Sequence, residues 1–254
     1  MASLFSHEIR AMFWIPLLGG LFAACALPGS PSEDSSALES RAESDSPPPS
    51  EDPYLLGQAA KMRGDWNTAL NRFDEASAKH ADSGPFWTLV GETNLAFFAE
   101  RMTQGESDGL LLQGLQLDAG LAFHKAAKLQ SSQSFWKLAV EAFRNAGEFQ
   151  RAWECASEGA EQNKGSLTLA TKLEFSRAGL ALTIEAIQSG QSPPAAATLT
   201  SEWLLPLARE GIPGTATLLS DLYAWQGLHD QASQVLAASL SKLPEDSEAL
   251  GRLK

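Results

Sequence analysis

Cysteine and histidine, the side chains that most often carry chemistry, are few in this sequence and lie far apart. The 254 residues contain two cysteines, Cys25 and Cys155, and four histidines that stand singly. None has the spacing of a CxxC or HxxxH metal site, and there is no HExxH, nucleophile-elbow, P-loop or dinucleotide motif. The sequence therefore predicts no enzyme, no metal and no other cofactor, and we expect Cys155 to be a buried, unreactive thiol.

Cys25 differs because of the residues before it. Arg10 precedes a mostly apolar stretch at 11–22 and then two alanines. The stretch is shorter than the about 20 residues that a membrane-spanning helix needs, and its length is typical of a signal peptide. The segment Leu21-Phe22-Ala23-Ala24-Cys25 resembles the lipobox of bacterial lipoproteins, although leucine is usual where Phe22 stands. The resemblance implies cleavage after residue 24 and acylation of Cys25.

Two other interpretations of this segment stay open. Ala24-Cys25-Ala26 also fits the A-x-A site of an ordinary secreted protein, and the apolar stretch could remain as an uncleaved anchor. If Cys25 is acylated, its acyl chains bind the membrane stably. In bacterial lipoproteins, an aspartate directly after the acylated cysteine is associated with retention in the inner membrane. Here alanine stands at that position, Ala26, which favours an outer-membrane lipoprotein that faces the periplasm.

The next segment, residues 25–52, is expected to be a disordered acidic linker. Residues 28–52 contain eight serines, five prolines, seven acids and one base, a net charge of −6. Such a segment buries too little apolar surface to offset the entropy of ordering. The whole chain has a net charge of −12, and because nucleic-acid binding relies on lysine and arginine, we expect no nucleic-acid partner.

Residues 53–254 show helical periodicity and an internal repeat. A glycine stands between two apolar-periodic segments at Gly64, Gly147 and Gly227, and an alanine follows each by five residues, at 69, 152 and 232. Glycine ends a helix by adopting a left-handed conformation, and alanine lets two helix axes approach closely. Four residues further on stand Phe73, Ala156 and Leu236, bulky in two of the three repeats. A small residue follows on the same face, at 76, 159 and 239.

This spacing resembles the tetratricopeptide repeat (TPR), a helix–turn–helix of 34 residues. Trp87 and Trp136 match its first-turn aromatic residue, Gly57 and Gly91 its early glycine, and Pro244 its terminal proline. The resemblance implies an all-α, TPR-like α-solenoid of about five repeats with ten or eleven helices, and residues 245–254 as a possible cap.

Two of the repeats are irregular, because the intervals between the marker glycines exceed two repeat lengths. In the second repeat the excess lies between Ala99 and Asp118 and includes a leucine-rich run at 110–117. We expect this run to extend the following helix and pack into the solenoid, with an exposed apolar patch as the alternative. In the fourth repeat a helix at 167–188 leads through a Pro-rich loop to a helix that ends near Arg209, and its register is left open.

By the same resemblance, the first helix of each repeat lines a groove that binds a partner. Helical spacing places twelve residues there: Tyr54, Gln58, Lys61, Met62, Thr88, Glu92, Lys137, Glu141, Arg144, Asn145, Asp221 and Trp225. In family members that bind chaperone C-termini, a Lys/Asn/Arg clamp holds the carboxylate. Tyr54 and Gln58 stand where the clamp lysine and asparagine would be, so that activity is not predicted.

The leading hypothesis is a membrane-tethered adaptor that binds protein or peptide partners in the bacterial cell envelope and aids assembly of an envelope complex. The alternatives are an enzyme or enzyme activator in cell-wall turnover, and a secreted repeat protein without an anchor.

Overall fold

The structure is a computed structural model that describes residues 52–163 and 166–241. These residues lie within one compact unit, 49–254. Several predicted features lie outside the described residues: the signal peptide (1–24), the lipidation site Cys25, the linker up to residue 51, the terminal proline Pro244 and the cap at 245–254.

Helices make up most of the described chain, and no strand occurs within it. Their bounds are α2 (Pro53–Met62), α3 (Trp66–Ala76), α4 (Gly84–Thr103), α5 (Gly109–Gln130), α6 (Gln133–Asn145), α7 (Phe149–Asn163), α8 (Leu169–Gln188), α9 (Ala195–Glu210), α10 (Thr215–Trp225) and α11 (His229–Leu240). None of these helices combines the length and the apolar character that a membrane span requires.

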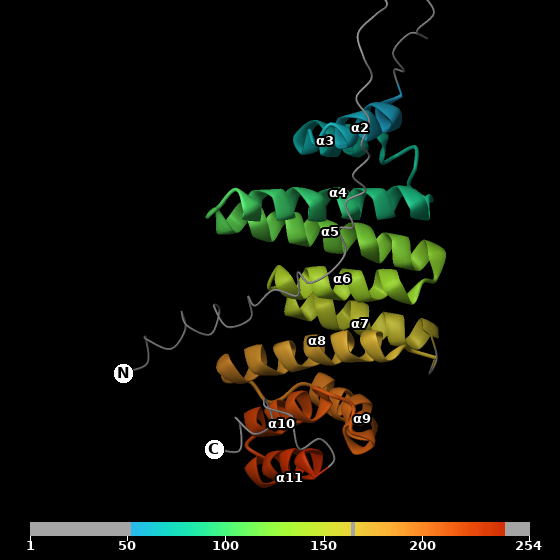
Figure 1. Cartoon of the computed structure of the whole chain (residues 1–254). Coiled ribbons are helices and arrows are strands. Elements are labelled where there is room, and N and C mark those ends of the chain that lie inside the picture. The colour runs from blue at the N-terminus through green and yellow to red at the C-terminus, as the bar shows by residue number, and fades with distance from the viewer. Residues whose placement is uncertain (1–51, 164–165, 242–254) are drawn as a thin grey trace, which may run out of the picture. The chain divides into compact units, whose positions relative to one another are not determined.

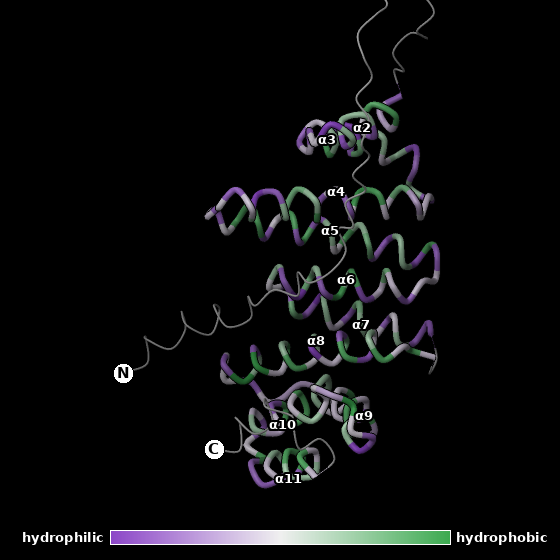
Figure 2. The backbone as a smooth tube through the Cα atoms, in the orientation of Figure 1, coloured by the Kyte–Doolittle hydropathy of each residue, from purple (hydrophilic) through white to green (hydrophobic). Residues whose placement is uncertain are grey.

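The helices pack as consecutive pairs, α2–α3, α4–α5, α6–α7, α8–α9 and α10–α11, and each pair contacts the next. Figure 1 shows the pairs in layers that follow chain order. Along the helices, hydrophilic and hydrophobic residues alternate, so each helix can cover its neighbours with one side (Figure 2). The prediction of an all-α solenoid with about five helix–turn–helix repeats is confirmed.

The predicted turns form as their glycines require. Gly64, Gly147 and Gly227 have φ values of 74°, 77° and 78°, in the left-handed region. At each turn the glycine N–H and the next residue's N–H donate to carbonyls of the preceding helix; Gly147 donates to Arg144 and Glu148 to Phe143. These bonds satisfy carbonyls that the helix end would otherwise leave free.

The paired helices approach closely where small residues face aromatic rings. Ala69 and Ala152 are fully buried and Ala232 nearly so, as predicted. A Cβ atom added to Gly57 would meet the Phe73 ring at 2.6 Å, and one added to Gly91 would meet the Phe123 ring at 2.8 Å. The early glycines are therefore the sites where the second helix of each pair sets an aromatic ring against the first.

The insertion in the second repeat lengthens both of its helices. α4 has 20 residues and α5 has 22, whereas α6 has 13. Within the leucine-rich run, Leu112 and Leu115 are buried and Leu117 packs against the core that contains Phe143, while Leu110 is 81% exposed. The run extends α5 and packs inward, as predicted, and one leucine remains on the surface.

Candidate binding surface on the first helices of the repeats

α6 carries three of the predicted groove residues on one face. Lys137, Glu141 and Arg144 follow each other at intervals of four and three residues, which aligns them along a helix. Ser132 is the N-cap residue of α6, and the last helical residue is Asn145. The left-handed backbone of Gly147, two residues further on, prevents the helix from continuing. This face of α6 packs beside α8, the first helix of the next repeat.

α8 supplies two charged residues that the sequence did not single out, Glu174 and Arg177. Oε1 of Glu174 accepts a hydrogen bond from Nε of Arg144 at 2.8 Å, and its Oε2 accepts one from Nη1 of Arg177 at 3.0 Å. The Glu174 side chain is only 3% exposed. A carboxylate so deeply buried needs charged partners, and the two arginines provide them.

The remaining charges of this surface have no such partners. Neither Lys137 nor the Glu141 carboxylate forms a hydrogen bond or an ion pair within residues 52–163 and 166–241. Burial raises the pKa of Glu141, and the nearby Glu174 raises it further, while Lys137 and the two arginines oppose the shift. An incompletely solvated carboxylate beside a free ammonium group favours a partner that supplies the missing contacts.

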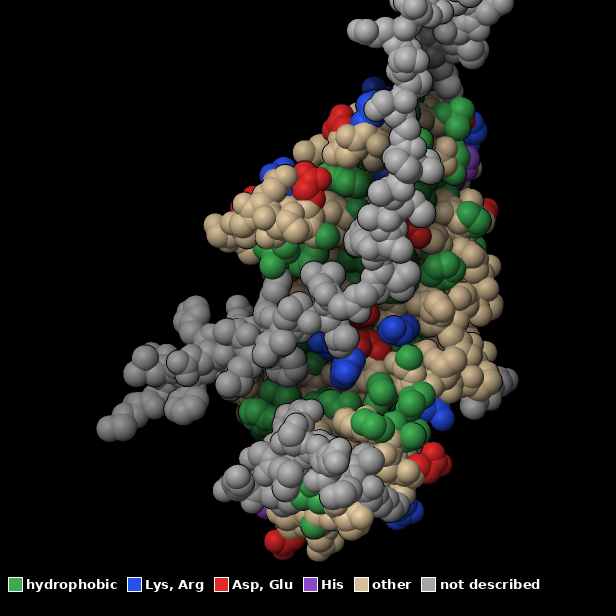
Figure 3. Space-filling model, viewed as in Figure 1, with side chains coloured by type: hydrophobic (Ala, Val, Ile, Leu, Met, Phe, Trp, Pro, Cys, Tyr) green, Lys and Arg blue, Asp and Glu red, His purple; other side chains and the backbone are tan. Residues whose placement is uncertain are grey.

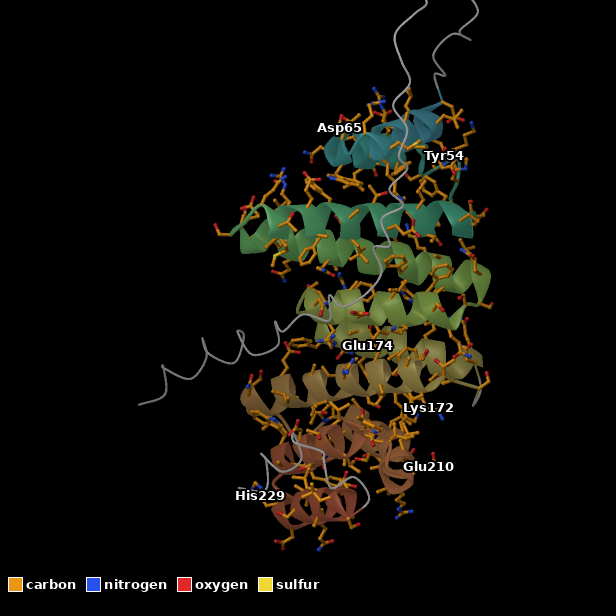
Figure 4. The ribbon with its side chains drawn as sticks, viewed as in Figure 1. Tyr54, Asp65, Lys172, Glu174, Glu210 and His229 are labelled. Atoms are coloured by element: carbon orange, nitrogen blue, oxygen red, sulfur yellow. The ribbon has the colours of Figure 1, made fainter. Side chains whose placement is uncertain are left out.

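Five side chains thus form what we call the α6–α8 charged cluster: Lys137, Glu141, Arg144, Glu174 and Arg177. Figure 3 shows Lys, Arg and acidic side chains gathered over α6 and α8, and Figure 4 places Glu174 between these two helices. With three cations and two carboxylates, the cluster carries one net positive charge in a chain whose net charge is −12.

Other predicted residues meet in the first two repeats. Nζ of Lys61 lies 3.3 Å from Oε2 of Glu92, which joins α2 to α4. The Thr88 hydroxyl donates to the Gly84 carbonyl at 3.1 Å and accepts from Nε2 of Gln130 at 3.2 Å. Glu92 is exposed and Lys61 and Thr88 are half-buried, and each already contacts a neighbouring helix or its own helix.

Tyr54 and Gln58 contact each other, since Nε2 of Gln58 donates to the Tyr54 hydroxyl at 2.7 Å. The Tyr54 ring also packs against Phe73, His80 and Phe86, so it covers the core of the first repeat. Tyr54 is therefore a half-buried packing residue whose hydroxyl stays near the surface.

The last four predicted residues lie apart from the cluster or at its edge. Met62 and Asn145 are exposed at the ends of α2 and α6. Asp221 and Trp225 lie on α10, where Trp225 packs against the core around Leu219 and Leu222. The structure therefore brings together only part of the predicted groove set, centred on α6.

Outside this surface, Cys155 and His124 have structural environments. Cys155 is buried, and burial raises the pKa of its thiol strongly, which disfavours the reactive thiolate. His124 shares a hydrogen bond of 2.8 Å with Glu158, which also contacts Lys128 at 3.0 Å. Within the described residues, no three His, Cys, Asp or Glu side chains converge as a metal site would require.

Together, the paired helices and their exposed charged face define the class of this chain as an all-α helical-repeat protein with TPR-like units. Two solved structures are similar to it. One is the MamA protein, at 15% identity and a TM-score of 0.48 over 77% of this chain and 92% of that one. The other is YrrB, described as a TPR protein with an unusual peptide-binding site, at 11% identity and a TM-score of 0.48 over 79% and 89%.

No family model matches the sequence, and no curated protein sequence matches it. The two structural likenesses have identities too low to carry a function from those proteins to this chain.

Proposed function

We propose that this chain is a protein-binding adaptor that holds a protein or peptide segment of a partner on the α6–α8 charged cluster. The observation that supports it is that some charges of the cluster are paired within the protein and others are not. Glu174 uses both oxygens to fix Arg144 and Arg177, while Lys137 and Glu141 stand beside them without partners.

A fixed arrangement of charges favours binding, because little side-chain entropy is lost when the partner arrives. Arg177 is 43% exposed and forms one bond to Glu174 through Nη1, so other guanidinium N–H groups are left to donate. Together with Lys137, these donors suit carboxylates and backbone carbonyls of a partner, and Glu141 offers an acceptor beside them.

The tether belongs to the same proposal. Cys25, in its lipobox-like segment, would carry acyl chains that hold the protein on a membrane of the cell envelope. The acidic linker up to residue 52 would separate the repeat domain from that membrane. The partner would be part of an envelope assembly. Detergent phase partitioning and the mass of the mature N-terminus test this part. A mature protein that begins at Ala26 or Leu27 without acylation would contradict the tether and leave a secreted adaptor.

Crosslinking and recovery of partners from membranes tests the binding surface. Lys137→Glu reverses a free charge of the cluster without removing a bond that holds α6 to α8, so the fold is retained and partner recovery should fall at least about tenfold. The matched control is Lys172→Glu, because Lys172 lies on α8 away from Glu174 (Figure 4). Equal recovery by wild type and both variants, with unchanged circular dichroism, would reject the cluster as the binding site.

A further inference from the structure

A concave surface lies on another side of the repeats, between α3, α4 and α5. It is a hollow of about 480 Å³, and α4 contributes Trp87, Val90 and Asn94 to its floor. These residues lie at helical angles roughly opposite to Thr88 and Glu92 on the same helix. The hollow is therefore separate from the surface that carries the α6–α8 charged cluster.

The floor contains a buried amide with a free acceptor. Asn94 is 3% exposed, and its Nδ2 donates to the Val90 carbonyl at 3.1 Å. Its amide oxygen has no hydrogen bond among the described residues, although Asn94 lines the hollow. This oxygen can therefore accept a hydrogen bond from an N–H donor that enters the hollow.

The lining carries a net negative charge, because it contains two carboxylates and one lysine. Asp74 of α3 and Asp118 of α5 both line the hollow, and neither has an ion pair within residues 52–163 and 166–241. Burial raises the pKa of Asp118, although the residue as a whole remains exposed. The one cation of the lining, Lys125, holds its Nζ 3.8 Å from the centre of the Trp87 ring.

Apolar side chains complete the lining. Leu121 of α5 is 42% exposed and lies beside Ala122, and Leu70 of α3 faces the same hollow. We propose that this α3–α5 hollow binds an extended segment of a partner protein that places a lysine or arginine between Asp74 and Asp118 and an apolar side chain against Leu121.

The chemistry of the walls excludes the main alternatives. Two unpaired carboxylates repel nucleic acid and anionic membrane surfaces, whereas a basic side chain gains an ion pair with each. The backbone N–H groups of an extended segment supply the donor that the Asn94 oxygen lacks, and the apolar part of the lining removes hydrophobic surface of the segment from water. The hollow therefore suits a basic and partly apolar peptide.

Selection of a phage-displayed library of random dodecapeptides on the full-length protein tests this proposal. Peptides with lysine or arginine beside leucine, isoleucine or valine should be enriched. For a synthetic peptide of that kind, the Asp74→Asn/Asp118→Asn variant should raise the Kd by about fivefold or more, since two charge pairs are lost. Asp230→Asn, on the exposed start of α11, is the matched control and should leave the Kd unchanged.

The binding site is located by ¹⁹F NMR of protein labelled with 5-fluorotryptophan. The Trp87 resonance, assigned by Trp87→Phe, should shift on addition of the peptide. Lys137→Glu should not change the Kd, which separates this hollow from the α6–α8 charged cluster. Failure to enrich basic peptides, an unchanged Kd for the double variant or an unmoved Trp87 resonance would each overturn the proposal.

Discussion

Nε of Arg144 donates a hydrogen bond of 2.8 Å to Oε1 of Glu174, and this bond joins the first helix of the third repeat to the first helix of the fourth. Because Arg177 occupies the second oxygen of Glu174, the carboxylate is satisfied on both sides while remaining 3% exposed. The same bonds hold Arg144 and Arg177 in place beside Lys137, so one buried carboxylate both joins two repeats and shapes the surface.

Replacing Glu174 should therefore destabilise the protein. Glu174→Gln removes the negative charge and leaves Arg144, whose side chain is only 15% exposed, without a counter-charge. Breaking a buried pair by removing one partner is costly, and we expect the free energy of unfolding to fall by about 2–3 kcal/mol. Urea denaturation followed by far-UV circular dichroism measures the change.

The control is Glu185→Gln, which makes the same chemical change on an exposed residue of α8. Surface substitutions of this kind usually change stability by less than about 0.5 kcal/mol. If the two variants unfold at the same urea concentration, Glu174 does not have the structural role assigned to it.

Two glycines should respond to alanine with opposite signs. Gly91 of α4 lies against Phe123, and an added Cβ would stand 2.8 Å from that buried ring, so Gly91→Ala should cost about 1–3 kcal/mol. Gly114 of α5 has no such neighbour within 4 Å, so Gly114→Ala should stabilise the helix by about 0.5–1 kcal/mol. Thermal unfolding of both variants beside wild type checks the two signs.

A double variant locates the cause of the Gly91 effect. Phe123→Leu replaces the ring by a smaller side chain, so adding Gly91→Ala to that background should cost less than it does in the wild type. Equal costs in both backgrounds would mean that the ring is not what excludes the methyl group.

The local features of the fold could be predicted because their causes are local. A left-handed turn needs glycine, and Gly64, Gly147 and Gly227 mark such turns directly in the sequence. Close helix approach needs a small residue at a fixed distance after the turn, and Ala69 and Ala152 supply it. These two signals suffice to place three of the five helix pairs.

The candidate site was only partly predictable because two of its five residues, Glu174 and Arg177, come from α8 in the next repeat. Arg144 and Glu174 are 30 residues apart in sequence, and their meeting depends on the register of the fourth repeat, which the sequence left open. The one signal in the sequence was a pair of opposite charges, Arg144 and Glu174, separated by about one repeat length. The two first-turn aromatic matches also differ in detail, because in α4 Phe86 is buried beside the partly buried Trp87, whereas in α6 Trp136 itself is buried.

Glu141 should lower stability in the absence of a partner. Burial raises the pKa of its carboxyl group, so the folded state binds its proton more tightly than the unfolded state does. The contribution of Glu141 to stability is therefore greatest at acidic pH. It falls as the pH rises from the ordinary pKa of the carboxyl group, 4.5, through its raised pKa in the folded state. Glu141→Gln should raise the melting temperature at neutral pH but not at about pH 4.

Glu141 is part of the proposed binding surface, and residues that serve binding often lower stability. The same Glu141→Gln variant should therefore recover less partner from membranes than wild type does, although it is more stable. A variant that is more stable and binds as well as wild type would show that Glu141 takes no part in the surface.

Glu158 of α7 should give the opposite dependence on pH. Burial opposes its ionisation, but hydrogen bonds from His124 and Lys128 of α5 outweigh burial and hold its pKa below the usual 4.5. Stability from a carboxylate with a lowered pKa is fully present above 4.5 and is lost as the pH falls through the folded value. Because the side chain is 34% exposed, we expect less than about 1 kcal/mol. Glu158→Gln should unfold at lower urea concentration than wild type at about pH 5.5 and together with it at about pH 3. If the urea midpoints of variant and wild type differ equally at both pH values, the effect of Glu158 is not electrostatic.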